Sequence, residues 1–233
     1  MKKICFICFR EGSKGLKNKN FKIINGLPLY KHTINQAIKS NIFDKIVIST
    51  DSKKIYKKYY MNKNTDIYCF FIRPKRLSND KARKLSVIQH ALIKSESYFN
   101  CEFDIIFDLD VTSPLRNIND IKNALKIFLN KNSSNLFSVC LSHKNPYFNM
   151  VEVNNNKLKK VKILKKEVYS RQNAPKVYDM NASIYIWKRS FLIKSNSIFT
   201  KKTSYYEMPQ NRSIDIDSIS DFKYVEFLMK NNN

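Results

Sequence analysis

The sequence predicts an α/β fold with a doubly wound, mostly parallel sheet. Short and nearly continuous apolar runs recur along the chain, for example at 4–9, 45–50 and 104–110. Each of these runs precedes a segment whose apolar residues repeat at helical spacing. Strands that are apolar throughout are buried on both faces, which is typical of a parallel sheet covered by helices on both sides. Ligands of such sheets bind beyond the carboxyl ends of the strands, so we expect the functional site there.

The predicted elements alternate along the first part of the chain. Strands are expected at the apolar runs 4–9, 21–26 (a short strand and turn), 45–50, 68–72, 104–110 and 136–141. Helices are expected where apolar residues recur at helical spacing, at 28–38, from 53 onward, at 81–97 and at 118–129. Two helix starts carry capping residues, because Ser52 precedes the second helix and Asp80 precedes the third.

The pattern changes after about Ser142. A polar turn at 154–156 separates two strand-like stretches, which predicts an antiparallel hairpin. We therefore expect a small segment within 142–170 to project from the sheet. A strand-like pattern returns at 181–188, and no linker or repeat divides the chain, so residues 1–233 are expected to form a single domain.

The chain ends in two further predicted elements. Residues 213–217 alternate apolar and acidic side chains, which predicts a short strand. Residues 221–229 have the pattern of an amphipathic helix that closes the chain.

The composition indicates a globular protein without a dedicated nucleic-acid partner. Hydrophobic residues make up 43% of the 233 residues, and the formal net charge is +24. Such a charge favours a polyanion as partner. The lysines are spread along the whole chain, however, together with many asparagines and isoleucines, which indicates a coding bias as much as a binding surface. We therefore expect no nucleic-acid role.

The cysteines and the apolar runs predict a reduced, cytoplasmic protein. The five cysteines are an odd number, and most lie in apolar runs where a thiol behaves as a small hydrophobe. Cys5 and Cys8 have Cys-x-x-Cys spacing, but no second pair accompanies them, so a zinc or redox site is not expected. No run resembles a signal peptide or approaches the roughly 20 residues of a membrane span, so we expect no membrane partner.

A basic loop that contains glycine follows the first predicted strand. Gly12 and Gly15 are two of only three glycines in the chain, and glycine permits positive φ and close approach of backbone N–H groups to a ligand. Basic side chains suited to a polyphosphate surround them, at Arg10, Lys14, Lys17 and Lys19. Neither of the two best-known phosphate-loop spacings is present. An ordinary turn with solvated lysines is the alternative interpretation.

The run Arg-x-Gly-Ser-Lys-Gly-Leu-x-x-Lys-Asn, from Arg10 to Asn20, resembles the N-terminal signature of the cytidylyltransferases that activate sialic acid and related nine-carbon acid sugars. The resemblance extends from Ile4 to about Asp217. It implies a Rossmann-like fold of the nucleotide-diphospho-sugar transferase type. It also implies CTP as co-substrate, held by loop residues Arg10, Gly12, Ser13, Lys14, Lys19 and Asn20.

Two aspartates near the C-terminus, Asp215 and Asp217, form a candidate metal site. On a strand they would share one face, and two carboxylates suffice for Mg²⁺ that is also bound to substrate phosphates. From the residues alone, a helix cap at Asp217 or Ser218 is about equally favoured. The family that the chain resembles has the same Ser-Ile-Asp-Ile-Asp sequence as its metal-binding motif, which implies Mg²⁺ at this pair.

A third motif, Arg73-Pro74-x-x-Leu77-x-x-Asp80, resembles the family's Arg-Pro-x-x-Leu-x-x-Asp. That motif lines the nucleotide pocket, which implies that Arg73 lies against the ribose or the cytosine. Lys84 would contribute from the first turn of the following helix. The run Lys81–Lys84 replaces the small residues usual in the family, and a solvated basic helix start is the alternative.

The sugar end is where the chain departs most from the family. The resemblance implies a sugar site built from Asp110, Thr112, Ser113, Arg171, Gln172, Asp179 and Asn181. Asp110 stands where glutamine is usual, and Asp179 where arginine is common. Because an ionised aspartate only accepts hydrogen bonds, these departures predict a sugar with more N–H donors than N-acetylneuraminic acid, such as legionaminic acid. The alternative is that either aspartate is merely exposed at the surface or paired with a nearby lysine.

These observations predict an enzyme that joins CTP to a sialic acid-like nonulosonic acid, releasing CMP-sugar and pyrophosphate for surface glycan synthesis. Arg10, Lys14 and Lys19 would stabilise the transferring phosphates, with Mg²⁺ at Asp215 and Asp217. The alternatives are a cytidylyltransferase for an eight-carbon, Kdo-type acid and a degenerate, non-catalytic nucleotide-binding module. The resemblance also implies a homodimer, in which the projecting segment 142–170 reaches the partner's active site.

Overall fold

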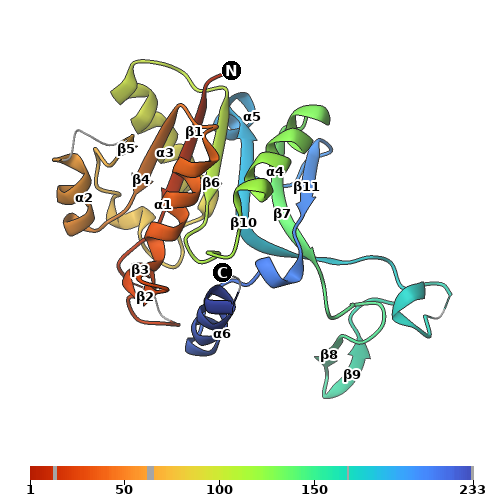
Figure 1. Ribbon diagram of the computed structural model, residues 1–233. Helices are drawn as coiled ribbons and strands as arrows, with labels where there is room; N and C mark the ends of the chain where they lie inside the picture. Colours follow the sequence, from red (N-terminus) through yellow and green to blue (C-terminus); the bar gives the residue numbers. More distant parts are fainter. Residues whose placement is uncertain (13–14, 62–65, 167, 232–233) are drawn as a thin grey trace.

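A seven-stranded sheet forms the centre of the molecule in the computed structural model, which describes residues 1–12, 15–61, 66–166 and 168–231 (Figure 1). Its strand order is β11-β7-β10-β6-β1-β4-β5. The strands are β1 (Lys3–Cys8), β4 (Lys45–Ser49), β5 (Ile67–Tyr68), β6 (Ile105–Leu109), β7 (Asn135–Leu141), β10 (Tyr178–Lys188) and β11 (Thr203–Glu207). β10 is antiparallel to its neighbours β6 and β7, and the other neighbouring pairs are parallel. The predicted mostly parallel sheet is confirmed.

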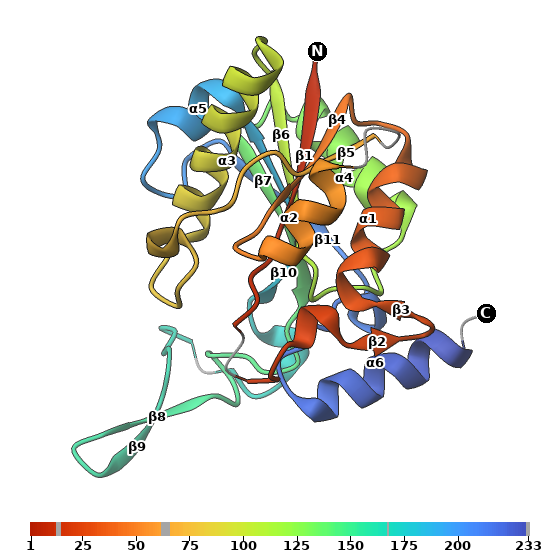
Figure 2. The same cartoon turned by 90° about the vertical axis from the view of Figure 1, so that its left-hand side faces the viewer.

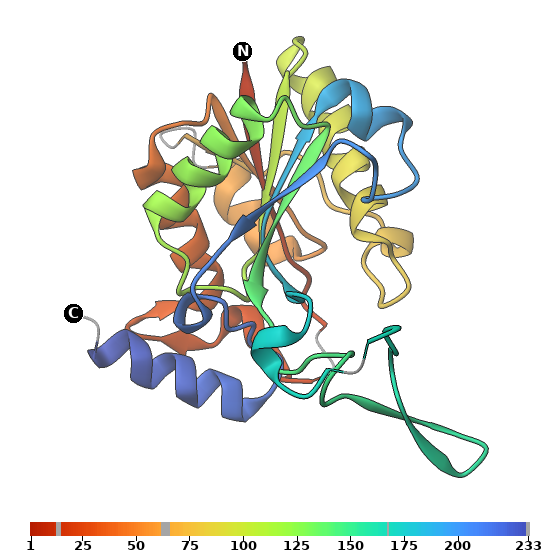
Figure 3. The ribbon, with the colours of Figure 1, turned by 90° about the vertical axis from the view of Figure 1, so that its right-hand side faces the viewer.

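Helices cover both faces of this sheet. They are α1 (Leu29–Ser40), α2 (Lys53–Tyr60), α3 (Lys84–Phe99), α4 (Ile118–Asn130), α5 (Arg189–Lys194) and α6 (Ile219–Asn231), with 3₁₀ turns at Lys19–Phe21, Lys75–Leu77, Arg171–Asn173 and Gln210–Arg212. α1 and α4 lie on one face, and α3 and α5 on the other (Figures 2 and 3). α6 lies across the carboxyl ends of the parallel strands (Figure 1). No helix within the described ranges is long and apolar enough to cross a membrane.

Alternate side chains of each strand enter two separate cores. On β1, Cys5 and Ile7 belong to the core beneath α1 and α4, whereas Ile4 and Phe6 belong to the core beneath α3 and α5. All four are fully buried. Burial on both faces explains why the strand is apolar throughout, and it confirms the doubly wound arrangement.

Two small hairpins lie outside the main sheet. β2 (Ile23–Ile24) pairs with β3 (Leu27–Pro28) through Asn25-Gly26, and both turn residues have positive φ. β8 (Val151–Asn154) pairs with β9 (Lys157–Lys160) through Asn155-Asn156, also with positive φ, as a two-residue hairpin turn requires. The β8–β9 hairpin projects from the molecule (Figure 1), and its strand residues are all exposed. The predicted antiparallel hairpin is confirmed.

The start of α3 differs from the prediction. The helix begins at Lys84 rather than Lys81, and Arg83 is its N-cap residue. The side chain of Asn79 accepts a hydrogen bond from the backbone N–H of Lys81 at 2.9 Å and so stabilises a turn before the helix. Asp80, the expected cap, forms an ion pair with Arg10 instead.

The strand predicted at 213–217 is wrong. Among the described residues this stretch pairs with no strand, and the backbone N–H of Ile216 donates to the carbonyl of Thr112 at 2.9 Å. Ile216 is fully buried, so the apolar alternation correctly predicted a buried side chain but wrongly predicted strand pairing. The edge strand beside β7 is β11. It has no apolar run, because its inward-facing residues are Ser204 and Tyr206.

A buried carboxylate anchors this C-terminal stretch to the sheet. Asp120, in the first turn of α4, forms a capping box with Asn117 and accepts two hydrogen bonds from the guanidinium of Arg212, at 2.8 and 3.0 Å. Tyr206 donates to the same carboxylate at 2.9 Å. The fully buried carboxylate of Asp120 therefore ties both β11, through Tyr206, and the turn at Arg212 to the start of α4.

Asp120→Ala should lower the free energy of unfolding by about 3 kcal/mol, because it leaves Arg212 and the helix N-terminus without their acceptor. Denaturant titration measures the loss. The matched control is Glu226→Ala, which removes the exposed i,i+4 pair with Lys230 in α6 and should cost no more than about 0.5 kcal/mol. Equal losses in the two variants would contradict the anchoring role.

Candidate active site

A cavity of about 460 Å³ opens at the carboxyl ends of the parallel strands. Most of the predicted nucleotide and metal residues line it, together with two of the predicted sugar residues: Arg10, Lys19, Asn20, Arg73, Lys84, Asp110, Thr112, Asp215 and Asp217. They come from the loop after β1, the turn before α3, the end of β6 and the stretch before α6. A cavity therefore lies at the edge of the sheet where the functional site is expected.

Two polar side chains fix the backbone where β1 ends. The amide of Asn20 donates to the carbonyl of Arg10 at 3.0 Å. The guanidinium of Arg73 donates to the carbonyl of Phe9 at 2.9 Å and to the hydroxyl of Ser78 at 3.2 Å. Asn20 and Arg73 are both buried, so each serves the shape of the loop as well as the wall of the cavity.

Gly15 is required for close packing rather than for its backbone angle. A β-carbon at Gly15 would overlap the backbone carbonyl oxygen of Asp217. Neither Gly12 nor Gly15 has a positive φ, which among the glycines occurs at Gly26. The glycine loop therefore lies directly against the acidic motif, 200 residues away in sequence. Ser13 and Lys14 lie outside the described residues.

Lys19 links the loop to the acidic motif. Its ammonium group lies 2.7 Å from a carboxylate oxygen of Asp217 and 2.5 Å from the carbonyl oxygen of Ile216. The side chain of Asp217 is 77% exposed and that of Lys19 is largely buried. The helix cap, the alternative role for Asp217, is taken by Ser218, whose hydroxyl accepts from the backbone N–H of Asp221 at 3.2 Å.

Asp215 has the properties of a carboxylate that lacks a cation. Its Oδ1 atom is buried, and no hydrogen-bond donor reaches it from the described part of the chain. Burial, followed by the charges of Asp110 and Asp217, raises the pKa of Asp215 to about 6. The described part of the chain contains no cluster of three His, Cys, Asp or Glu side chains that could hold a metal ion. Asp215 and Asp217 therefore fit a Mg²⁺ ion that takes its other ligands from substrate phosphates and water.

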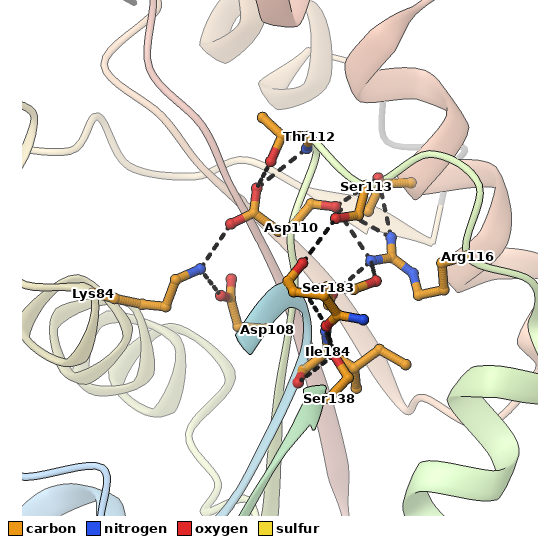
Figure 4. Close-up of polar contacts among 11 residues, drawn as sticks. Lys84, Asp108, Asp110, Thr112, Ser113, Arg116, Ser138, Ser183 and Ile184 are labelled. Atoms are coloured by element: carbon orange, nitrogen blue, oxygen red, sulfur yellow. Dashed lines mark hydrogen bonds and ion pairs between the residues drawn. The ribbon is translucent and has the colours of Figure 1, made fainter. Parts of the chain in front are cut away.

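A lysine lies between two carboxylates at the floor of the cavity (Figure 4). The ammonium of Lys84 is 2.7 Å from Oδ2 of Asp108 and 2.9 Å from Oδ2 of Asp110. Burial disfavours the ammonium, but the charges of Asp108 and Asp110 raise the pKa of Lys84 well above its usual range. Burial also opposes ionisation of Asp110, yet Lys84 and Thr112 hold its pKa below the usual value. Burial raises the pKa of Asp108.

Asp108 and Arg116 are site residues that the sequence prediction missed. A charged residue inside an otherwise apolar strand must have a partner, and that signal could have identified Asp108. Arg116 lies fully buried behind the cavity and donates to the carbonyls of Asp110 at 3.3 Å and Ser183 at 2.6 Å (Figure 4). It therefore holds the backbone of the carboxyl end of β6 against β10.

The other predicted sugar residues do not line this cavity. Ser113 is buried and donates to the carbonyl of Asn181 at 3.3 Å. Asn181 is itself buried, and its amide donates to the hydroxyl of Ser213 at 2.9 Å. Asp179 is exposed on β10, opposite Cys140 of β7. None of these three residues lines the cavity, and the exposure of Asp179 matches the alternative interpretation of that residue.

Arg171 and Gln172 lie in a second cavity, of about 370 Å³, at the base of the projecting segment. The guanidinium of Arg171 donates to the carbonyl of His143 at 2.6 Å. Within one chain, therefore, the predicted sugar residues do not meet in one cavity.

Comparisons with known proteins agree with this geometry. A family model described as cytidylyltransferase matches residues 4–233. The chain is 45% identical over 226 residues to the CMP-N,N′-diacetyllegionaminic acid synthase of Campylobacter jejuni, covering 97% of this chain and 94% of that protein. It is 44% identical over 230 residues to the post-translational flagellin modification protein B of Campylobacter coli, covering 99% and 96%. The N-acylneuraminate cytidylyltransferase of Streptococcus agalactiae is 33% identical over 228 residues, covering 97% of this chain and 52% of that protein.

A solved structure shows the same fold. CMP:2-keto-3-deoxy-manno-octonic acid synthetase, complexed with CTP, superposes with a TM-score of 0.72 over the full length of both chains, at 15% identity. The family model matches residues 4–233, and one cavity gathers the cationic residues, the acidic residues and residues predicted to hold the nucleotide. The chain therefore belongs to the cytidylyltransferase family and is a nucleotidyltransferase.

Proposed function

We propose that this enzyme transfers CMP from CTP to a nine-carbon, diacetamido acid sugar of the legionaminic acid type, for modification of surface glycans. The observation that carries the proposal is the cavity that joins Arg10 and Lys19 to the Asp215–Asp217 pair, in a chain 45% identical to a CMP-N,N′-diacetyllegionaminic acid synthase. The cytoplasm, where CTP is available, is the proposed location.

The protein contributes mainly positioning and charge to this reaction. The sugar hydroxyl attacks the α-phosphorus in line, and pyrophosphate leaves. Arg10 and Lys19 face the cavity as cations for the triphosphate, with Lys14 as a proposed third. Arg73 and Asn20 keep the end of β1 in place beside the cytidine, because both donate to its backbone carbonyls.

Asp215 and Asp217 would hold Mg²⁺, which when bound neutralises phosphate charge and lowers the pKa of the attacking hydroxyl. The binding of CTP also releases Lys19 to a phosphate, because phosphate oxygens compete with Asp217 for its ammonium. Arg116 and Thr112 fix the end of β6 and thereby the sugar side of the cavity.

Asp110 is proposed to select the sugar through one remaining acceptor position. Its Oδ1 atom already accepts from the N–H and the hydroxyl of Thr112, and its Oδ2 atom accepts from Lys84. A carboxylate oxygen has two acceptor positions, so Oδ2 can take one further donor. An amide N–H of a diacetamido sugar fits this position.

A second copy of the chain is proposed to complete the sugar site. The projecting segment carries exposed apolar side chains that one chain leaves uncovered, among them Val153 and Leu158, each 71% exposed, and Ile163, 82% exposed. Arg171 and Gln172 lie at the base of that segment, away from the main cavity. A partner's segment would bring such residues to the cavity.

Pyrophosphate release tests the substrate. With CTP and Mg²⁺, kcat/KM for N,N′-diacetyllegionaminic acid should exceed that for N-acetylneuraminic acid by at least about tenfold, because Asp110 would accept from the second acetamido N–H, which N-acetylneuraminic acid lacks. The eight-carbon Kdo acid and a reaction without sugar are the controls. A preference for N-acetylneuraminic acid or Kdo rules the sugar assignment out.

Asp215→Asn should abolish turnover and yet stabilise the ligand-free protein at neutral pH. Because the folded pKa of about 6 exceeds the usual 3.8, the folded state binds more protons, so wild-type stability falls as pH rises between these values. We expect the variant to gain roughly 1–3 kcal/mol above about pH 6 and nothing near pH 4. Urea titrations at several pH values measure this.

Asp217→Asn is the control for that experiment, because the side chain of Asp217 is mostly exposed. It should also stop turnover but bring no gain in stability. If Asp215→Asn destabilises the protein at neutral pH, the carboxylate is not held in an unfavourable state.

Light scattering tests the dimer. The wild type should have twice the mass of the 27.6 kDa chain, and Val153→Asp with Leu158→Asp should give a folded monomer, because each buries a charge in the proposed interface. Lys157→Asp, at the exposed tip of the same hairpin, is the control and should stay dimeric. A monomeric wild type contradicts the proposal.

A further inference from the structure

Two carboxylates project together at the carboxyl end of β6. Asp108 and Asp110 stand at positions i and i+2, and Lys84 lies between their Oδ2 atoms at 2.7 and 2.9 Å (Figure 4). Asp108 is fully buried, and Asp110 lines the cavity. A pair of carboxylates beside a phosphate-binding cavity is the usual protein contribution to a Mg²⁺ site.

We propose that the ammonium group of Lys84 takes the place of a second divalent ion between Asp108 and Asp110, so that the enzyme works with one metal ion, at Asp215 and Asp217. The inference rests on the proposed function, because it concerns the metal that accompanies CTP.

The first argument is charge balance. Two adjacent carboxylates in a buried place both ionise only if a cation lies between them. Apart from Lys84, none of the donors that reach this pair from the described ranges is charged: Oδ1 of Asp110 accepts from Thr112, and Oδ1 of Asp108 is buried without a donor. The ammonium of Lys84 therefore supplies one of the two positive charges that a divalent ion would supply at this place.

The second argument is that the fold, and not the substrate, fixes Lys84. The residue begins α3, whose next residue, Leu85, is buried in the core with Ile88. Its ammonium also lies 4.7 Å from the centre of the Tyr185 ring on β10, which adds a cation–π contact. The lysine is thus held on three sides before any ligand enters.

The third argument is against the simpler role of Lys84 as a phosphate ligand. Two of the three donors of the ammonium are used by Asp108 and Asp110, so a phosphate can take only the third unless the ammonium leaves Asp108, which has no exposure to water. A buried carboxylate without its cation is strongly unfavourable. Lys19 differs in this respect, because its partner Asp217 is mostly exposed and can be left to solvent.

Counting bound Mn²⁺ by electron paramagnetic resonance tests the proposal directly. The measurement uses the full chain with CTP and without sugar, so that no turnover occurs. The wild type should bind one Mn²⁺ per CTP-loaded chain. Lys84→Met opens the place between the carboxylates and should bind two.

Kinetics provide a second readout. At fixed Mg·CTP, excess free Mg²⁺ should not raise the wild-type rate. Lys84→Met should lose roughly 100-fold in kcat/KM at low free Mg²⁺ and regain at least about tenfold at millimolar free Mg²⁺, because the ion then fills the vacated place. The expected result is a new requirement for metal, rather than a simple loss of activity.

Three variants control these measurements. Lys84→Met combined with Asp108→Asn removes half of the carboxylate pair and should lose both the second Mn²⁺ and the rescue by Mg²⁺. Lys84→Arg keeps a cation and should keep the one-metal behaviour. Lys81→Met removes an exposed lysine just before α3 and should behave as the wild type.

Two Mn²⁺ ions per CTP-loaded wild-type chain would overturn the proposal, and so would Lys84→Met that gains no Mn²⁺ and only binds CTP more weakly, as loss of a phosphate ligand predicts. If Lys84→Met does not fold, the wild-type count and Lys84→Arg still decide. Failure of the proposed sugar chemistry leaves the Mn²⁺ counts unaffected, so the two failures are distinguishable.

Discussion

The balance of charge at the carboxyl ends of the strands is the constraint on which the rest of the site depends. Four carboxylates lie there, Asp108, Asp110, Asp215 and Asp217, and the sheet, the helices and the C-terminal stretch each contribute to their surroundings. The ammonium of Lys84 lies between the first two carboxylates. The ammonium of Lys19 forms an ion pair with the exposed Asp217. Asp215 is left with a buried oxygen that lacks a donor. The uncompensated place is the one where the metal and the triphosphate are proposed to meet, and stability lost there serves binding.

This balance requires that segments far apart in sequence be held at fixed separations. The stretch before α6 reaches the cavity because Asp120 anchors Arg212 behind it. It approaches the glycine loop closely because Gly15 has no side chain to separate them. Arg116 fixes the third participant, the end of β6. Asp120 and Arg116 act from behind the cavity, because neither of them lines it.

Local patterns were sufficient for the fold class and for much of the site. Apolar runs located the central strands because these strands are buried on both faces, and the Asn154–Asn156 turn located the projecting hairpin. Sequence motifs located Arg73, Lys19 and Asp215 in one cavity. The errors arose where tertiary contacts determine the local structure. Asp80 pairs with Arg10 rather than capping α3, and the stretch 213–217 has no strand partner among the described residues. The Lys84 bridge was not predictable, since a helix start and a strand end meet only in three dimensions.

The direction of β10 has a consequence for how this protein can vary. Because β10 is antiparallel to β7, the chain leaves the sheet at the end of β7 and returns to it at the start of β10 along the same edge. The two ends of the projecting segment therefore lie beside each other at the carboxyl ends of the parallel strands (Figure 1). Residues can be inserted, deleted or exchanged between these ends without altering the strand register of the seven-stranded sheet. The seven-stranded sheet can thus stay constant over generations while the segment between β7 and β10 diverges in sequence and length.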